Sequence, residues 1–219
     1  MKTRRFDLIA FDWDGTLFDS TALIVRCIQA ACGELGLAVP SDEQAAFVIG
    51  LGLHDALRHA APGLAAERYP ELGLAYRRHY FAHQDDLALF PGTLAMLHDL
   101  KARNHWLAVA TGKSRRGLDE ALAHAHLARL FDGSRTADET ASKPSPLMLQ
   151  ELMREFGVEP ERTLMIGDTT HDLQLARNAG AAAVGVSYGA HGRETFGLFD
   201  PLYVAADTAA LHRWLLENA

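Results

Sequence analysis

Residues 7–20 of the chain, DLIAFDWDGTLFDS, place two carboxylates directly after a short apolar run. A near-continuous apolar run such as residues 8–11 is typical of a strand buried on both faces of a parallel sheet. Asp12 and Asp14 then lie at the carboxyl edge of the sheet, where open α/β folds bind ligands. Two neighbouring negative charges are costly unless a cation or a shared proton compensates them. The stretch predicts either a reactive, cation-binding edge or a solvated acidic turn.

The rest of the chain divides into a helical part and an alternating part. Residues 18–87, which we call the helical insertion, carry helical patterns and no convincing strand, with Ser20 and Ser41 as predicted N-caps. From residue 88 onward strand and helix patterns alternate, which predicts a doubly wound parallel α/β sheet with right-handed crossovers. We expect strands at 8–11, 105–110, shortly after 130–132, and at 163–166, 181–186 and 202–205. We expect helices at 21–35, after 41, and at 54–61, 65–87, 93–103, 115–126, 146–156, 172–179 and 208–216.

Composition and charge narrow the class of protein. The 219 residues are 48% hydrophobic and 22% charged, which is ordinary for a globular protein. A formal net charge of −7, with no basic run, argues against a nucleic-acid partner. No apolar stretch approaches the roughly 20 residues needed to cross a bilayer, and the short apolar run near the N-terminus is interrupted by Asp12 and Asp14. We therefore expect a cytoplasmic protein with no membrane partner.

Three further motifs follow the first in order. They are Val109-Ala-Thr-Gly112, Ser142-Lys-Pro144 and Leu164-Met-Ile-Gly-Asp-Thr-Thr-His-Asp172. Together with the Asp-Trp-Asp-Gly-Thr of the first motif, this set resembles the haloacid-dehalogenase superfamily, and more closely its phosphoglycolate-phosphatase-like branch. The resemblance implies a Rossmann-like core formed by residues 1–17 and 88–219. It also implies that the helical insertion, residues 18–87, is a small cap placed after the first strand.

The resemblance assigns the acidic residues to phosphoryl transfer. It makes Asp12 the nucleophile that forms an acyl phosphate, and Asp14 the general acid that protonates the leaving alcohol and later activates water. It also implies Mg²⁺, held by the Asp12 side chain, the Asp14 backbone carbonyl and the Asp168 side chain, because this ion prefers oxygen ligands. Asp172 either supports this site or acts as an acidic residue at a helix N-terminus.

Other residues of the motifs are expected to bind the phosphoryl group. The Thr111 hydroxyl and the backbone N–H of Gly112 form a ready anion site at a helix start. By resemblance, Lys143 binds phosphate and offsets the carboxylates. Lys113 is expected to be solvated, and Trp13 to pack or line the entrance with partial exposure.

The helical insertion offers candidates whose roles the sequence leaves open. Gly50 and Gly52 match a glycine-rich cap loop that faces the active site, but an ordinary turn between helices would look the same. His54 and Arg58 could meet a substrate anion, although a surface pair explains them as well. The roles of three residues near the predicted carboxyl edge also stay open: His171, Tyr188 and His191.

The leading hypothesis is a Mg²⁺-dependent phosphatase that hydrolyses small phosphorylated metabolites such as phosphoglycolate, as a monomer or homodimer. A sugar phosphomutase shares all four motifs and is the first alternative. A haloacid dehalogenase is disfavoured because it has no use for Asp14. A phosphate-binding or receiver-like protein without catalytic activity is the alternative from another class. Receivers are about half this length and lack a cap, and a degenerate binding protein would be expected to have lost some of the motif residues.

Overall fold

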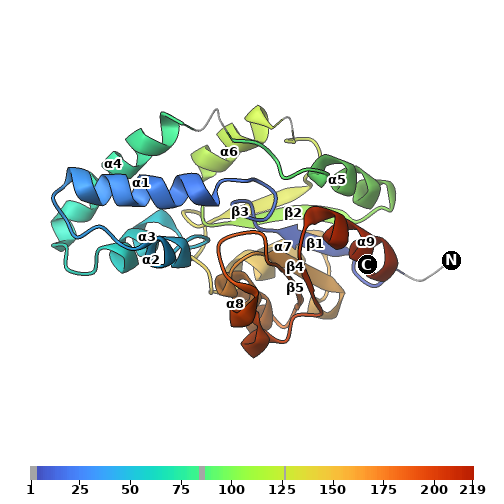
Figure 1. Cartoon of the computed structure of the whole chain (residues 1–219). Helices are drawn as coiled ribbons and strands as arrows, with labels where there is room; N and C mark the ends of the chain where they lie inside the picture. Colours follow the sequence, from blue (N-terminus) through green and yellow to red (C-terminus); the bar gives the residue numbers. More distant parts are fainter. Residues whose placement is uncertain (1–3, 84–86, 126) are drawn as a thin grey trace.

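A computed structural model describes residues 4–83, 87–125 and 127–219 (Figure 1). Within these residues, six strands form one parallel sheet in the order β3-β2-β1-β4-β5-β6. The strands are β1 (Leu8–Phe11), β2 (Trp106–Thr111), β3 (Gly133–Thr136), β4 (Thr163–Gly167), β5 (Ala182–Val186) and β6 (Tyr203–Ala205). The predicted doubly wound α/β sheet is therefore confirmed.

The first strand occupies the middle of the sheet. Phe11, its last residue, pairs with Val109 of β2 on one side and with Ile166 of β4 on the other. All four residues of β1 are buried, as its continuous apolar sequence predicts. Because the strands are parallel, the residues that follow β1, β2 and β4 meet at one edge, where the reversal of strand order leaves room for a ligand.

Alternate residues of the strands face two different helical layers. Ile9 and Phe11 pack in one core with α5 (Thr93–Ala102), α6 (Arg115–His124) and α9 (Thr208–Asn218). Leu8 and Ala10 pack in a second core with α7 (Leu147–Phe156), α8 (Thr170–Ala179) and the 3-10 segment η4 (Arg193–Phe199). The sheet is thus covered on both faces, and its carboxyl edge is left for the helical insertion.

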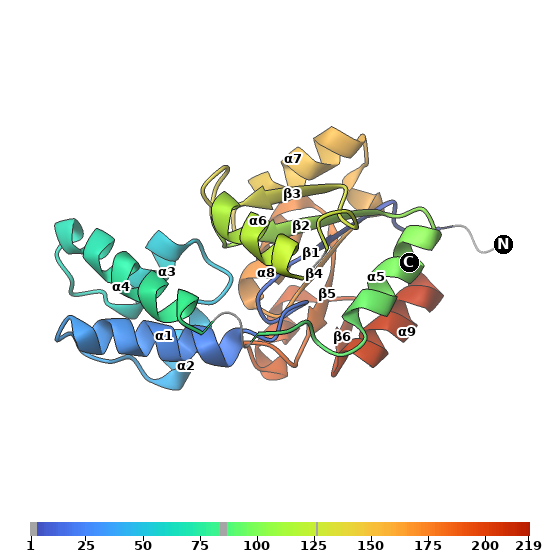
Figure 2. The ribbon, with the colours of Figure 1, turned by 90° about the horizontal axis from the view of Figure 1, so that it is seen from above.

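The helical insertion has a core of its own. It contains α1 (Thr21–Glu34), α2 (Asp42–Phe47), α3 (Leu53–Ala60), η1 (Ala66–Arg68) and α4 (Tyr69–Phe81). Figure 2 shows these helices gathered beyond one end of the sheet. Their buried apolar residues form a third cluster, separate from the two cores that flank the sheet.

Most predicted elements agree with the structure to within a few residues, and the differences have local causes. The helix expected over 65–87 is split into η1 and α4, and α4 ends at Phe81; residues 84–86 lie outside the described part, as does residue 126 at the end of another predicted helix. Ser41 caps α2 through its side chain, as predicted. Ser20 occupies the N-cap position of α1, as predicted, but its side chain makes no cap hydrogen bond.

None of the helices in the described residues has the length and apolar character required to cross a membrane.

Candidate active site

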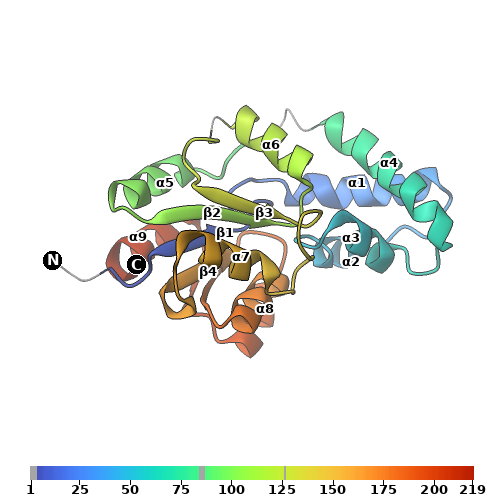
Figure 3. The ribbon, with the colours of Figure 1, turned by 180° about the vertical axis from the view of Figure 1, so that it is seen from behind.

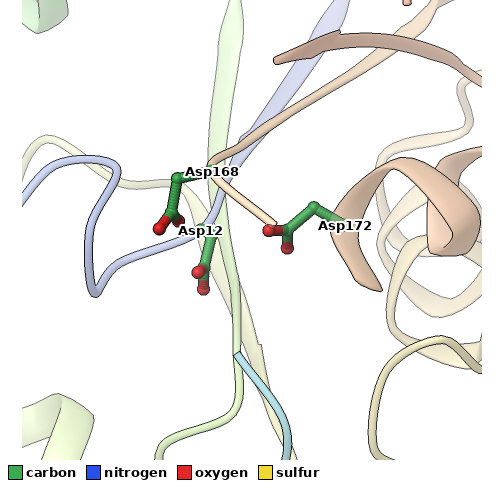
Figure 4. Close-up of side chains that lie close together, drawn as sticks. All are labelled: Asp12, Asp168 and Asp172. Atoms are coloured by element: carbon green, nitrogen blue, oxygen red, sulfur yellow. The ribbon is translucent and has the colours of Figure 1, made fainter. Parts of the chain in front are cut away.

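Three carboxylates from two strand ends and one helix meet at the carboxyl edge of the sheet. Asp12 follows β1, Asp168 follows β4, and Asp172 lies in the first turn of α8. One carboxylate oxygen from each lies within 4.8 Å of those of the other two (Figure 4). All three residues are buried, with at most 1% of their surface exposed. We call this group the acidic cluster.

A buried lysine bridges two members of the acidic cluster. The Lys143 Nζ lies 2.7 Å from Asp12 Oδ1 and 2.6 Å from Asp172 Oδ1, and its side chain is fully buried. Burial alone would lower the pKa of Lys143, but the two carboxylates outweigh burial and raise that pKa above its ordinary value. Lys143 is therefore charged. Its contacts with Asp12 and Asp172 agree with the expectation that it offsets the carboxylates.

One lysine does not neutralise three carboxylates. When all are ionised, the acidic cluster with Lys143 carries an excess of two negative charges. Burial, and then the charges of Asp172 and Asp168, raise the pKa of Asp12 well above its usual range, although Lys143 opposes this. Burial and the neighbouring Asp172 likewise raise the pKa of Asp168 to about 7. Such an excess of buried negative charge is what a divalent cation compensates.

The Asp168 carboxylate is held in place from two sides. Its Oδ1 accepts a hydrogen bond from Thr16 Oγ1 at 2.9 Å, and its Oδ2 accepts one from the Ala190 backbone N–H at 2.7 Å. Gly15 has a φ of +79°, and a Cβ on it would lie 2.1 Å from Asp168 Oδ2. Only glycine fits this turn. Sequence reasoning singled out neither Thr16 nor Ala190, and a backbone donor such as Ala190 leaves no signal in the sequence.

Asp172 has a structural role as well as its contact with Lys143. Its Oδ2 accepts hydrogen bonds from the Thr169 backbone N–H at 3.0 Å and from Thr169 Oγ1 at 2.6 Å. Thr169 in turn accepts a bond from the Asp172 backbone N–H, which completes a capping box at the start of α8. Asp172 thus orients Lys143 and caps the helix at the same time.

The side chain of Asp14 is not part of the acidic cluster. Its Oδ1 accepts a hydrogen bond from Ser20 Oγ at 2.7 Å, and its Oδ2 lies 3.1 Å from Lys113 Nζ. The Ser20 hydroxyl therefore donates its hydrogen bond to Asp14 and does not cap α1. Lys113 is only 12% exposed and also donates to the Tyr80 hydroxyl of α4 at 3.1 Å. The expectation that Lys113 is solvated was wrong, because its partner comes from a distant helix.

Two of the predicted phosphate-binding residues, Thr111 and Gly112, lie where β2 ends. Thr111 is buried, and its Oγ1 accepts a hydrogen bond from the Lys113 backbone N–H at 3.2 Å. A Cβ on Gly112 would lie 2.3 Å from the Leu51 carbonyl oxygen. The turn between α2 and α3 thus packs directly on Gly112, and the Gly52 backbone N–H donates to Ser142 Oγ at 2.9 Å. This turn, residues 50–52, faces the site motifs.

Two histidines outside the helical insertion contact the last residue of α2. His171 Nε2 and His191 Nε2 lie 2.8 and 3.1 Å from the Phe47 carbonyl oxygen. A carbonyl only accepts, so each Nε2 carries a proton. Burial lowers the pKa of both histidines, which favours the neutral form. By contrast, His54 is exposed and lies 3.7 Å from Asp55 rather than near the acidic cluster.

Trp13 is part of the core rather than of an entrance. It is fully buried in the core beneath α5, α6 and α9, and its ring packs 5.5 Å from that of Phe18. The predicted partial exposure was wrong, because the indole packs among the apolar side chains of this core. No acceptor for its Nε1–H is found in the described part of the chain.

Comparison with known proteins agrees with this geometry. A family model described as haloacid dehalogenase-like hydrolase matches residues 9–186. The tyrosine-protein kinase PtkA of Mycobacterium tuberculosis is 34% identical over 86% of this chain, and the chain spans 64% of that relative's length. Probable phosphatase IndB of Dickeya dadantii is also 34% identical, over 92% of this chain and 89% of its own.

A solved structure from Haemophilus somnus, described as a predicted phosphoglycolate phosphatase, superposes with a TM-score of 0.85. It is 26% identical and covers 96% of this chain and 98% of its own. The family model spans well over half of the chain and includes the four motifs that gather at the sheet edge. The chain therefore belongs to the haloacid dehalogenase-like hydrolases.

Proposed function

We propose that this protein is a Mg²⁺-dependent phosphatase of small phosphorylated metabolites, working through an aspartyl phosphate on Asp12. The observation that carries the proposal is the acidic cluster with Lys143 at the carboxyl edge of a parallel sheet. A phosphoryl group brought there meets a carboxylate nucleophile, a lysine and the end of a strand that carries Thr111. The relatives named as phosphatases support the same reaction class.

The donor set fits Mg²⁺. Asp12 and Asp168 supply carboxylate oxygens, and Asp12 Oδ2 is buried with no hydrogen-bond partner among the described residues. Within the same residues, no hydrogen bond to the Asp14 carbonyl oxygen is found, so it too is available. Hard oxygen ligands beside an excess of negative charge favour this ion over softer metals. When bound, Mg²⁺ would neutralise the acidic cluster and the phosphoryl oxygens.

The protein's own residues divide the chemistry between them. The Asp12 carboxylate attacks phosphorus, and the bond from phosphorus to the leaving oxygen breaks as Asp14 gives that oxygen a proton. Water then attacks the acyl phosphate and gives a proton to Asp14, which restores Asp12 and releases phosphate. Lys143 stays paired with Oδ1 of Asp12 through both steps. Asp14 pairs with Lys113 in the structure, so protonation of Asp14 requires this pair to separate.

We also propose that the helical insertion, residues 18–87, acts as a cap over a core formed by residues 1–17 and 88–219. Its separate apolar cluster and the packing of residues 50–52 on Gly112 support this division. A cap in this position excludes water from the reacting phosphorus. The roles proposed for Thr111 and Gly112, which are to bind phosphoryl oxygens, rest on their place at the same edge.

The test is phosphate release from a panel of phosphorylated metabolites, with and without Mg²⁺, for wild type, Asp12→Asn and Asp14→Asn. We expect a few substrates to be hydrolysed by wild type and by neither variant, and a chelator to stop turnover reversibly. Isomerisation of a sugar phosphate without phosphate release would favour the mutase. Undiminished hydrolysis by Asp12→Asn would refute the covalent mechanism.

A further inference from the structure

Residues of the helical insertion and of α6 line a cavity of about 180 Å³. Figure 3 shows α6 next to the helices of the insertion. Asp14 and Gly112 line one end of the cavity, so it opens onto the proposed site of phosphoryl transfer. This volume holds several water molecules or one group of ring size. Since Asp14 is the proposed proton donor to the leaving oxygen, the alcohol part of a substrate would occupy this cavity.

The wall of the cavity is mainly apolar. Side chains from α1, from the end of α2, and from α3 and α4 form it, and they include Ile24, Ile28, Val48, Leu57, Tyr76 and Phe81. Most of these side chains are buried in the core of the helical insertion. An apolar group of a substrate that moves from water into contact with this wall is stabilised in proportion to the apolar area that it buries.

The buried charged groups at the cavity are already paired with each other. Among the lining residues that the structure describes, Lys113 is paired with Asp14 at 3.1 Å and also donates to the Tyr80 hydroxyl. Arg77, Glu120 and His124 also line the cavity, and all three are exposed to solvent. A second anionic group on the substrate would therefore lose its hydration against a mainly apolar wall, and it would gain a buried cation only by taking Lys113 as Asp14 releases it.

We propose that the protein prefers phosphate monoesters whose alcohol carries an uncharged apolar body, such as an aryl-alkyl group, over short doubly anionic substrates such as phosphoglycolate or pyrophosphate. This inference rests on the proposed phosphatase function. It adds the chemical class of the leaving group, which the apolar wall sets.

The first experiment compares three substrates with wild-type protein and Mg²⁺: 2-phenylethyl phosphate, 2-phosphoglycolate and inorganic pyrophosphate. The first two release primary alcohols, so the comparison tests the cavity rather than the reactivity of the leaving group. We expect kcat/KM for 2-phenylethyl phosphate to exceed that for 2-phosphoglycolate by about tenfold or more. Phosphate release from none of the three, with a substrate of the metabolite panel hydrolysed, would overturn this inference alone, whereas no release from any member of the panel would overturn the phosphatase function.

The other outcomes bear on the inference alone. Equal or faster turnover of phosphoglycolate or pyrophosphate would overturn the preference and leave the phosphatase function standing. A clear preference for phosphoglycolate would instead assign Lys113 to the substrate carboxylate.

A matched pair of variants on α4 tests the cavity directly. Phe81 and Leu74 are both large, apolar and 44% and 57% exposed, but only Phe81 lines the cavity. We expect Phe81→Ala to lower the ratio of kcat/KM for 2-phenylethyl phosphate to that for 2-phosphoglycolate by about threefold or more. Leu74→Ala should leave the ratio unchanged. If both variants changed the ratio alike, or if neither did, the cavity would not be the leaving-group site.

Discussion

Gly112→Ala probes the contact between the helical insertion and the core with a single methyl group. A Cβ at this position would lie 2.3 Å from the Leu51 carbonyl oxygen and 2.6 Å from that of Gly50, well inside the 3.0 Å that real Cβ atoms respect. The backbone turn must therefore move by about 1 Å, and a displacement of that size near reacting atoms costs about 100-fold in rate. We expect kcat/KM to fall by about that factor while the Gly112 N–H is retained.

Steady-state kinetics and urea unfolding together test this reasoning. Gly73→Ala is the matched control, because its Cβ on α4 would lie 3.7 Å from Leu57 Cδ1 of α3, an ordinary van der Waals contact. The control should keep wild-type kinetics and gain about 0.5–1 kcal/mol of stability. Gly112→Ala should lose about 1–3 kcal/mol from overpacking yet stay folded. A folded Gly112→Ala protein with wild-type kcat/KM would show that the turn does not close on Gly112 during turnover.

Three further predictions concern charge. Lys143→Met leaves Asp12 and Asp172 buried without their shared cation, and we expect a loss of about 3 kcal/mol or more in urea unfolding without Mg²⁺. Mg²⁺ at 100 times its Kd should stabilise wild type by about 2.7 kcal/mol, seen as a rise in Tm of about 5–10 °C. The Arg162 guanidinium beside Asp7 lowers the pKa of that carboxyl to about 2. Asp7→Asn should therefore cost about 1 kcal/mol at neutral pH, a difference present above about pH 4 and lost as pH falls through about 2.

Each of these predictions has a result that contradicts it. Lys143→Met as stable as wild type would mean that the acidic cluster is not ionised. The Mg²⁺ assignment would be contradicted if Mg²⁺ left the Tm of wild type unchanged. It would also be contradicted if Mg²⁺ raised the Tm of the Asp12→Asn and Asp168→Asn variants as much as that of wild type. A stability gap between wild type and Asp7→Asn that persists below pH 2 would show that packing, rather than charge, explains the Asp7 effect.

The fold was predictable because its signals are local. The apolar run of β1 is buried on both faces, and glycines or prolines mark several helix ends, so element types and order follow from the sequence. The gathering of Asp12, Lys143, Asp168 and Asp172 follows from parallel topology, because loops after neighbouring strands share one edge. The 3-10 segment Arg193–Phe199 was not predicted, since no regular periodicity marks it.

The surroundings of the second aspartate could not be read from the sequence. Lys113 pairs with Asp14 and reaches Tyr80, which is 33 residues away along the chain. Ser20 looked like a cap because its type and position fit one, yet its hydroxyl bonds to Asp14. The contacts of Lys113 with Tyr80 and of Ser20 with Asp14 depend on where the helical insertion sits against the core. That placement is set by packing, which no spacing in the sequence encodes.

The central claim is that Asp12 carries the phosphoryl group, and trapping that intermediate tests it most directly. Wild-type protein with Mg²⁺ and a substrate found in the panel would be quenched with acid within the first turnover. The acyl phosphate would then be reduced with borohydride, and the peptides sequenced by mass spectrometry. The account predicts that Asp12, and no other carboxylate, is converted to homoserine, and that Asp14→Asn accumulates less of this product or none. Turnover with Asp12 unmodified, or with another carboxylate reduced, would contradict it.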